Sequence, residues 1–368
     1  MSLGSIKFYC VINVTKAYLP PFSEYVAYLE GIWERGWLTN NGPLVQRLEA
    51  DLKTYLGGAQ VQFMSNGTIA LQVAIKALGL TGEIITTPFS YVATTTAILW
   101  ENCEPVFVDI EPATFCIDPA KIEAAITART TGILATHVYG YPCDVEAIAE
   151  IARRHNLKVI YDGAHAFGAT IQGRSLLTYG DITTCSFHAT KLFHTSEGGA
   201  IIVNDEELAR KVWLYKSFGH VGDDYFTLGV NGKNSEFHAA MGLCNLPRVA
   251  SFIESRHQLA DLYKADLAGL PIRYPVPGEP TLVCNHAYFP VVFESEAVML
   301  KVKIHLEGHE INTRRYFFPS LNKLPYHTGA DCPVSEDVSR RVLCLPFYQE
   351  LALSEASRIA ALIRQALA

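Results

Sequence analysis

Short apolar runs, rich in β-branched residues, alternate with segments of helical periodicity between about residues 45 and 245. Alternation of this kind predicts a mostly parallel sheet with helices on both faces, because each helix returns the chain to the starting edge. Only residues 188–199 separate the last two runs, and this short connection favours one antiparallel strand. The predicted strands are VQFMS (61–65), EIITTP (83–88), PVFVDI (105–110), TGILATHV (131–138), KVIYD (158–162), TTCSF (183–187) and AIIVN (200–204).

The segments between these runs carry helix signals. GTIALQVAIKALG (67–79) is apolar on most faces, which predicts a buried helix. In DPAKIEAAI, Asp118 suits the N-cap and Pro119 the first helical position. DVEAIAEIARRHN (144–156) alternates apolar and charged residues at helical spacing. We therefore expect an α/β fold with a central sheet in this part of the chain.

A long helical pattern from about Ser235 to Leu267 is expected to link this region to a second, smaller lobe. Its predicted elements are a strand in AYFPVVF (287–293), a helix in EAVMLKVKIHLEG (296–308), a strand near INTRR (311–315) and a terminal helix. The predicted division is residues 1–245 for an N-terminal segment plus a large domain, and 246–368 for a small α+β domain.

Composition narrows the class of protein. Hydrophobic residues form 49% and charged residues 18% of the 368-residue chain, which predicts a well-buried core. The net charge of −7, with no basic block, argues against binding to nucleic acid or to an anionic membrane surface. Nine cysteines without a CxxC pair indicate reduced thiols and no zinc site. With no membrane-length apolar run and no signal-peptide pattern at the N-terminus, the expected location is the cytoplasm.

Two residues at the ends of apolar runs carry the strongest chemical signal. Asp162 closes LKVIYD, and Lys191 follows the run in DITTCSFHATK. An acid that pairs with a pyridine nitrogen and a lysine that forms a Schiff base are what pyridoxal 5′-phosphate (PLP) requires from a protein. Alone, Asp162 more often caps a turn and Lys191 is more often a surface charge. Together with His165 at this spacing, they favour a PLP site.

Other polar residues fall near the predicted site. SNGT (65–68) lies between a strand and a helix, where the first helix N–H groups can donate to a phosphate. A plain N-cap by Ser65 or Asn66 is an equally good interpretation. Ser186 can add a hydroxyl to the same phosphate, and Tyr91 can stack on a cofactor ring or simply pack. A metal site from His165, His188 and His194 is a weak alternative, because their spacing is irregular and acidic partners are missing. The sequence contains neither a GxGxxG motif nor a Walker motif, so a nucleotide-binding loop is not indicated.

Five stretches in order resemble the DegT/DnrJ/EryC1/StrS family of sugar aminotransferases, which share the aspartate aminotransferase-like (PLP fold type I) architecture. The stretches are GWLTNNGPLVQRLE, SNGTIAL, YDGAHAFG, SFHATKLFHTSEGGA and GVNGKNSEFHAAMGL. The resemblance implies that Lys191 is the catalytic residue and holds PLP through an imine bond. It also implies cofactor contacts from Asp162 to the pyridine nitrogen, from His165 to the phenolic oxygen, from Gly67, Thr68 and Ser186 to the phosphate, and from Tyr91 to the ring face.

The same resemblance has consequences for partners. Asn231 would reach the phosphate of a second subunit, which requires a homodimer with shared active sites. The opening VTKAYLPP and the variant SFHATKLFHT look most similar to members that move an amino group from L-glutamate to C4 of a dTDP-linked 4-keto-6-deoxyhexose, for O-antigen or lipopolysaccharide synthesis. Amination at C3 and a catalytically silent PLP-binding protein stay as alternatives. Arg314, Arg315 and His188 are candidates for contact with the sugar-linked diphosphate.

Overall fold

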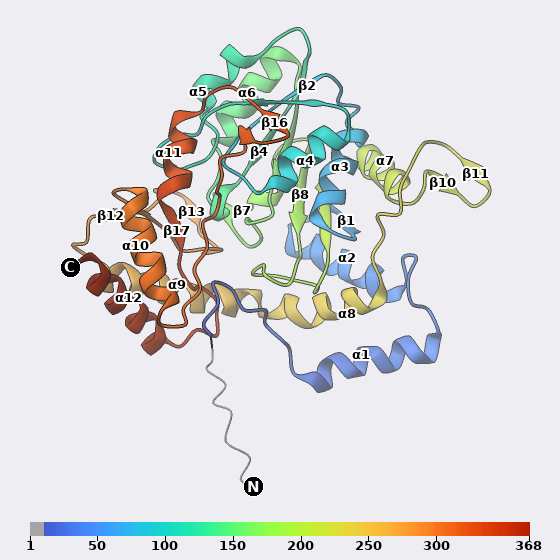
Figure 1. Ribbon diagram of the computed structural model, residues 1–368. Helices are drawn as coiled ribbons and strands as arrows, with labels where there is room; N and C mark the ends of the chain where they lie inside the picture. The colour runs from blue at the N-terminus through green and yellow to red at the C-terminus, as the bar shows by residue number, and fades with distance from the viewer. Residues whose placement is uncertain (1–10) are drawn as a thin grey trace.

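The computed structural model describes residues 11–368, so the expectations for the N-terminus and for Cys10 lie outside the described residues. A seven-stranded sheet forms the centre (Figure 1). Its strands, in spatial order, are β1 (Gln60–Met64), β9 (Gly199–Val203), β8 (Ile182–Ser186), β5 (Lys158–Asp162), β4 (Thr130–Thr136), β2 (Glu83–Thr86) and β3 (Glu104–Phe107). β9 runs antiparallel to both neighbours, and the remaining pairs are parallel. The predicted strands and the predicted antiparallel strand are confirmed.

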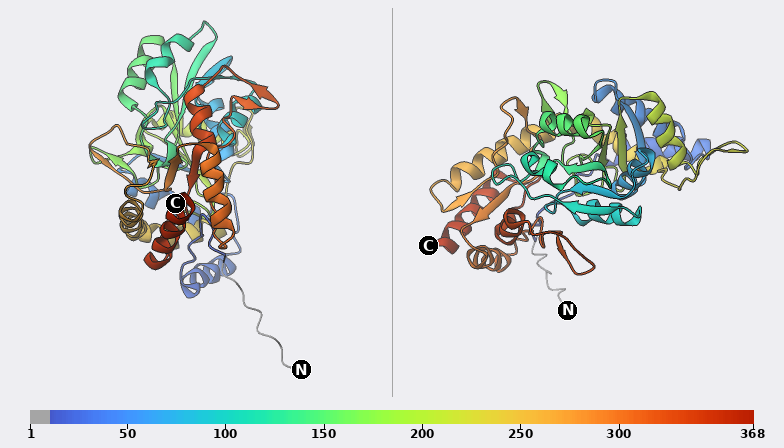
Figure 2. Two further views of the ribbon diagram at one scale, coloured as in Figure 1. Left: turned by 60° about the vertical axis from the view of Figure 1, so that its left-hand side comes forward. Right: turned by 90° about the horizontal axis from the view of Figure 1, so that it is seen from above.

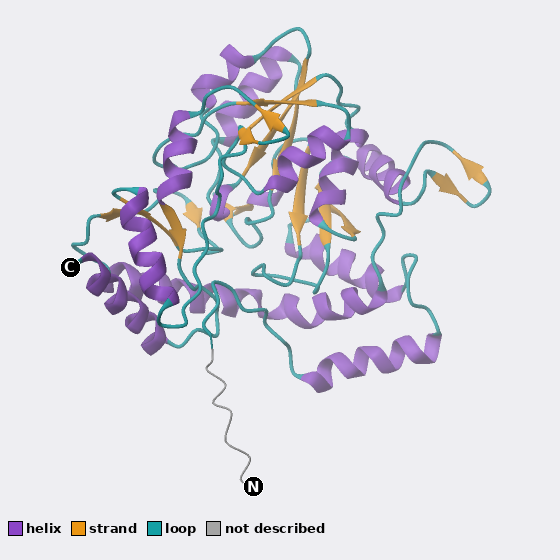
Figure 3. Cartoon of the chain, viewed as in Figure 1, coloured by secondary structure: helices purple, strands orange, loops and turns teal. Residues whose placement is uncertain are grey.

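The strands are apolar on both faces because both faces of the sheet are covered by helices (Figure 3). Successive residues alternate between two cores: Ile84 packs in one and Ile85 in the other, and Val159 and Ile160 divide in the same way. The helices that follow the strands are α3 (Gly67–Ala77), α4 (Val92–Trp100), α5 (Pro119–Ile122), α6 (Val145–His155) and α7 (Glu206–Lys216). Asp118 caps α5 through a bond from the backbone N–H of Ala120, as predicted.

Two helices precede the sheet and two follow it. α1 (Phe22–Arg35) and α2 (Pro43–Tyr55) lie with α8 (Glu236–Asn245) below the sheet in the view of Figure 1. After a short 3₁₀ turn, α9 (Val249–Asp266) continues the direction of α8 towards the C-terminal lobe. Between α7 and α8, a hairpin of β10 (His220–Val221) and β11 (Asp224–Tyr225) projects away from the body (Figure 2).

The C-terminal lobe has its own apolar core against α9. It contains a small antiparallel sheet of β12 (Ile272–Arg273), β14 (Pro290–Phe293) and β17 (Val342–Cys344), with α10 (Glu296–Glu307), α11 (Pro333–Arg341) and α12 (Leu353–Leu367). Short pairs complete the fold: β6 (Thr170–Ile171), β7 (Arg174–Ser175) and β13 (Leu282–Val283) in one sheet, and β15 (Lys323–Leu324) with β16 (His327–Thr328) in another.

One predicted element is wrong. INTRR forms no regular strand; Ile311 pairs only with Ile12, and Arg314 only with Cys344, each as a single bridge. The segment leaves the edge of the small sheet after these contacts and carries Arg314 and Tyr316 to the wall of a cavity. No helix among the described residues is long and apolar enough to cross a membrane. The eight described cysteines are all free thiols.

Candidate active site

The carboxyl ends of the parallel strands meet at one edge of the sheet, and a cavity of about 290 Å³ opens there. Thr136, Asp162 and Ser186 are the last residues of β4, β5 and β8. Gly67 and Thr68 begin α3 on the same edge. The topology therefore gathers residues that lie up to 119 positions apart (186 − 67) in the sequence.

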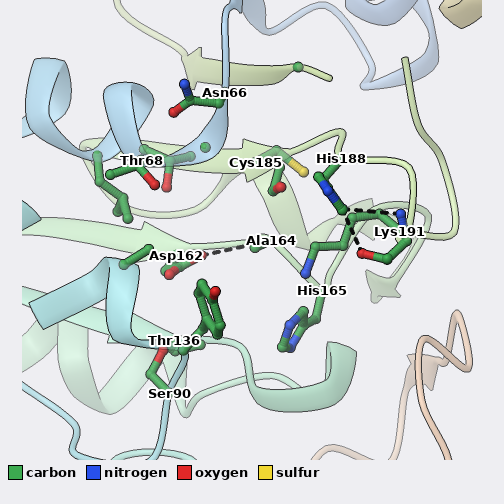
Figure 4. A pocket seen from close by; sticks show the side chains of 18 of the residues that line it. Asn66, Thr68, Ser90, Thr136, Asp162, Ala164, His165, Cys185, His188 and Lys191 are labelled. Carbon is green, nitrogen blue, oxygen red and sulfur yellow. Dashed lines mark hydrogen bonds between the residues drawn. The ribbon is translucent and has the colours of Figure 1, made fainter. Parts of the chain in front are cut away.

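Nine of the residues predicted from the sequence line this cavity. They are Gly67, Thr68, Tyr91, Asp162, His165, Ser186, His188, Lys191 and Arg314. Lys191 extends its amine towards the side of the cavity where Asp162 and His165 lie (Figure 4). Two predicted residues are not brought here. Arg315 pairs instead with Glu296 at 2.5 Å, and Asn231 is exposed outside the cavity, where it bridges Ser217.

Lys191 lies in apolar and aromatic surroundings. Its Nζ donates to the hydroxyl of Tyr288 at 3.4 Å, a long contact with a neutral partner. Burial lowers the pKa of the amine, and the nearby groups of Tyr316 and Asp162 offset only part of that effect. The consequence is a lysine that gives up its proton more readily than a surface lysine does.

Asp162 is buried, and its two oxygens have different partners. Oδ2 accepts from the hydroxyl of Thr94 at 2.8 Å, and Oδ1 accepts from the backbone N–H of Ala164 at 3.1 Å. Burial raises the pKa of this carboxyl, whereas both hydrogen bonds and the charge of Lys191 act in the opposite direction. Thr94 stands in the apolar helix α4, and its role was not predicted from the sequence.

His165 is held as a neutral imidazole with a defined tautomer. The backbone N–H of Tyr139 donates to its Nδ1 at 3.2 Å, so the ring proton sits on Nε2. Burial, assisted by the positive charge of Lys191, lowers the pKa of this imidazole well below its usual range. Phe317 stacks on the ring at 5.6 Å between centroids. Nε2 is therefore a fixed hydrogen-bond donor for a ligand in the cavity.

Unused hydrogen-bond donors gather at the start of α3. Asn66 caps this helix by accepting from the backbone N–H of Ile69 at 2.9 Å. Within the described residues, the N–H groups of Gly67 and Thr68 and the hydroxyls of Thr68 and Ser186 have no partner. A Cβ on Gly67 would lie 3.0 Å from the Cβ of Ser186, so glycine lets the helix start approach the end of β8. This arrangement suits a phosphate group.

The sequence-based prediction missed several aromatic and hydroxylic residues of the site, among them Thr94, Tyr288 and Tyr316. Tyr288 touches Lys191, and the backbone carbonyl of Tyr316 accepts a hydrogen bond from the hydroxyl of Tyr139. Tyr316 could have been suspected because it follows the two candidate arginines directly. Neither Thr94 nor Tyr288 carries a signal, because each stands in an apolar run that reads as ordinary core.

Comparison with known proteins agrees with this fold. Residues 23–364 match the DegT/DnrJ/EryC1/StrS aminotransferase family. A relative from Shigella dysenteriae named dTDP-4-amino-4,6-dideoxy-D-glucose transaminase is 42% identical, covering 96% of this chain and 98% of its own. The solved structure of DesI in the presence of its TDP-sugar product has a TM-score of 0.91 at 32% identity, covering 96% of this chain and 92% of DesI. NtdA from Bacillus subtilis, solved with bound cofactor PMP, has a TM-score of 0.85 at 33% identity over 94% of this chain and 81% of NtdA.

The chain belongs to the DegT/DnrJ/EryC1/StrS aminotransferase family. This membership confirms the predicted fold class and the predicted class of enzyme, an aminotransferase that acts on sugars. It also confirms pyridoxal phosphate as the cofactor of the class. The roles of individual residues in this chain stay predictions.

Proposed function

We propose that the protein transfers an amino group from L-glutamate to C4 of a dTDP-linked 4-keto-6-deoxyhexose, giving dTDP-4-amino-4,6-dideoxyglucose, with PLP as the carrier. The observation that supports this most directly is the assembly of Lys191, Asp162 and His165 around one cavity. The choice of sugar is supported by the name of the Shigella relative and by the nearly full length of its match.

The phosphate of PLP would lie at the start of α3. The N–H groups of Gly67 and Thr68 and the hydroxyls of Thr68 and Ser186 form a cradle of donors with no other partner in the described chain. The positive end of the helix dipole adds to the attraction. The absence of a side chain on Gly67 leaves this approach open, because a Cβ there would crowd Ser186.

The ring of PLP would lie between Asp162, His165 and Tyr91. The carboxylate of Asp162 would pair with the ring nitrogen, and Nε2 of His165 would donate to the phenolic oxygen. Tyr91, the N-cap residue of α4, is 52% exposed at the cavity and offers its face for stacking. When bound, PLP supplies an aldehyde for amine exchange and a protonated ring that withdraws electrons from the reacting carbon.

Lys191 would serve twice in the proposed reaction. Its amine would hold the cofactor at rest, and once released it would move a proton to and from the reacting carbon. A lowered pKa suits both tasks, because a neutral amine is needed to attack and to accept a proton. Tyr288, 3.4 Å from Nζ, lies where it can hold the amine between these steps.

Anionic parts of the substrates would meet Arg314 at the mouth of the cavity. No carboxylate of the described chain lies within ion-pair distance of this guanidinium, which packs over the ring of Tyr316. Arg315 is a weaker candidate, since Glu296 and the ring of Phe318 already hold it. His188 stands 3.5 Å from Glu197 at the same cavity and is a second candidate contact.

The volume of the cavity supports a site shared between two subunits. About 290 Å³ is near the low end for ligand pockets, so a nucleotide-linked sugar must extend beyond it. Asn231 stands exposed at the base of the projecting hairpin segment, outside the cavity of its own subunit. Large apolar side chains are exposed on this segment and on the neighbouring α1 region, among them Trp33 at 70% and Leu228 at 83%. We propose that these surfaces pair in a homodimer and that Asn231 reaches the partner's phosphate site.

A half-reaction assay tests the proposal. The PLP-loaded protein should lose its visible absorption band on addition of L-glutamate and release 2-oxoglutarate. An absorption band that does not change when glutamate is added would indicate a PLP-binding protein without turnover. With dTDP-4-keto-6-deoxyglucose and its 3-keto isomer supplied separately, NMR of the product identifies the aminated carbon. If only the 3-keto isomer gives a product, the enzyme aminates C3 and the proposed amination of C4 is wrong.

Complementation between two inactive variants tests the shared site. Lys191→Ala and Asn231→Ala homodimers should each be impaired, whereas mixed dimers contain one site with both native residues. Unfolding and refolding the two together should restore up to about a quarter of wild-type activity, because half the dimers are mixed and each has one intact site. An Asn231→Ala protein that is fully active as a monomer would refute the shared site.

A further inference from the structure

Three buried hydroxyl groups lie in line behind Asp162. The hydroxyl of Thr94 is 2.8 Å from Oδ2 of Asp162 and 2.7 Å from the hydroxyl of Ser90. The hydroxyl of Ser90 is in turn 3.0 Å from that of Thr136. Ser90 and Thr136 line the cavity close to Asp162, as Figure 4 shows, whereas Thr94 is fully buried in α4. The line joins three different elements, because Thr136 closes β4 and Ser90 precedes α4.

The order of protons along this line is determined by the carboxylate. An ionised Asp162 can only accept, so Thr94 must donate its single hydroxyl proton to Oδ2. The oxygen of Thr94 therefore accepts from Ser90, and the oxygen of Ser90 accepts from Thr136. All three dipoles point the same way, towards the negative charge, and each hydrogen bond polarises the next. A protonated Asp162 can instead donate to Thr94, so only the ionised form fixes this order.

We infer that Thr94 is a positioning residue of the aminotransferase site, and that Ser90 and Thr136 strengthen its hold on the ionised carboxylate of Asp162. This inference rests on the proposed pairing of Asp162 with the pyridine nitrogen of PLP. A carboxylate without the Thr94 bond is a stronger base, and it draws the shared proton away from the ring nitrogen. When the ring nitrogen is less fully protonated, the ring withdraws less electron density. The nitrogen of Lys191 that is bonded to PLP then becomes more basic.

The hydrogen bonds to Asp162 also limit where the ring nitrogen can bind. Thr94 takes one lone-pair direction on Oδ2, and the N–H of Ala164 takes one on Oδ1. The backbone carbonyl of Asp162 is held separately, because it accepts from the N–H of His137 at 3.1 Å. The carboxylate thus keeps one orientation, with its remaining lone pairs facing the cavity. Thr94 supplies this restraint without touching the cofactor.

A set of variants of the PLP-loaded protein tests the inference. Thr94→Val keeps the shape of the side chain and removes its hydroxyl, while Thr94→Ser keeps the hydroxyl. Ser90→Ala and Thr136→Val remove the second and third members of the line. Thr95→Val is the matched control, because Thr95 is the next residue of α4, is equally buried, and its hydroxyl has no partner among the described residues.

The readout is the pH at which the visible absorption band changes, recorded without substrate. A hydrogen bond to a charged acceptor alters its basicity by about 1 to 2 pH units, and part of this reaches the nitrogen at Lys191 across the ring. We expect Thr94→Val to raise the midpoint by roughly 0.5 pH unit or more, Ser90→Ala by less and Thr136→Val by least. Thr94→Ser and Thr95→Val should match the wild type.

Asp162→Asn separates failure of this inference from failure of the proposed function. If Asp162→Asn leaves the midpoint unchanged, the acid does not act on the ring, and the proposed role of Asp162 falls together with the inference. If Asp162→Asn raises the midpoint but Thr94→Val behaves like Thr95→Val, the role of Asp162 stands and the inference about Thr94 is overturned. A shift of equal size in Thr94→Val and Thr94→Ser would also overturn it, because the hydroxyl would then be irrelevant.

Discussion

Glu236 joins two distant parts of the chain, and its replacement is expected to destabilise the protein measurably. Its carboxylate is fully buried and accepts from the backbone N–H groups of Leu44 at 3.0 Å and Val45 at 2.9 Å. These belong to the first turn of α2, whose own N-cap residue, Gly42, offers no side chain. A carboxylate from α8 thus caps a helix that begins 193 positions earlier (236 − 43).

The size of the expected loss of stability follows from the hydrogen bonds that glutamine cannot make. Glu236→Gln keeps one acceptor oxygen but turns an NH₂ group towards the second N–H, so one charge-assisted hydrogen bond is lost, at about 1.5 to 3 kcal/mol. Loss of a negative charge at a helix N-terminus costs about 0.3 to 2 kcal/mol more. The sum is roughly 2 to 5 kcal/mol. For 368 residues an unfolding entropy of about 0.8 kcal/mol per kelvin converts this into a fall in Tm of roughly 3 to 6 °C.

Calorimetry or circular dichroism would measure this change, with Glu355→Gln as the control. Glu355 is a half-exposed glutamate in the first turn of α12, paired with Arg358, so its replacement should cost about 1 kcal/mol or less. Hydrogen exchange at the amides of Leu44 and Val45 should accelerate in Glu236→Gln and stay slow in the control. An unchanged Tm together with unchanged exchange at these two amides would refute the assigned cap.

A double-mutant cycle with Gly42 sharpens the test. A Cβ on Gly42 would lie 2.6 Å from Cδ of Glu236, while the backbone there (φ −71°) suits any residue. Gly42→Ala should therefore destabilise the wild type but cost little in Glu236→Ala, which lacks the crowding atoms. We expect a coupling of about 1 to 3 kcal/mol. Additive effects of the two changes would show that they do not act through this contact.

Three further predictions concern the site. Burial lowers the pKa of Lys191, and only the neutral amine reacts with PLP. The rate of PLP loading should therefore rise with pH and reach half its maximum at a pH below the ordinary lysine pKa of about 10.4. Stopped-flow absorbance measures this rate, and a midpoint at or above that pH would contradict the prediction. Lys191→Ala should keep the circular dichroism spectrum and Tm of the fold but show no borohydride-trapped cofactor on its peptide and no turnover. Arg314→Met should raise KM for the sugar nucleotide about 10-fold or more, whereas Arg315→Met should chiefly lower Tm; equal kinetic effects would contradict the separation of the two arginines.

The sheet was predictable because its strands are buried on both faces. Such strands appear as continuous apolar runs, and the run predicted at 158–162 coincides with β5 (Lys158–Asp162). The site was predictable for a topological reason, since polar residues that end parallel strands must share one edge. Asp162 was singled out as such a strand-end residue, with support from His165 and Lys191, whereas Ser186 was suggested by its closeness to Lys191 in the sequence and by the family resemblance.

Side-chain direction outside the sheet was not predictable. Arg314 and Arg315 are adjacent and chemically equal in the sequence, yet one lines the cavity and the other pairs with Glu296. The choice depends on the single bridge between Arg314 and Cys344, a contact between distant segments that no local pattern encodes. Thr94 was missed for a related reason. The sequence of an apolar helix does not show whether a threonine hydroxyl in it binds a distant carboxylate or a neighbouring backbone carbonyl.

The cap at Glu236 also bears on the cofactor site. Asn231 precedes Glu236 by five positions, and between them the carbonyl of Gly232 accepts from the backbone N–H of Ser65 at 2.8 Å. Ser65 leads directly into the donors at Gly67 and Thr68, so the segment that carries Asn231 is fastened both to α2 and to the proposed phosphate site. Loosening Glu236 should therefore weaken PLP retention as well as stability, although the carboxylate lies outside the cavity lining. PLP retention that stays at the wild-type level in Glu236→Gln, despite the lower Tm, would mean that the other hydrogen bonds of this segment, among them Ser65–Gly232, hold it in place without the cap.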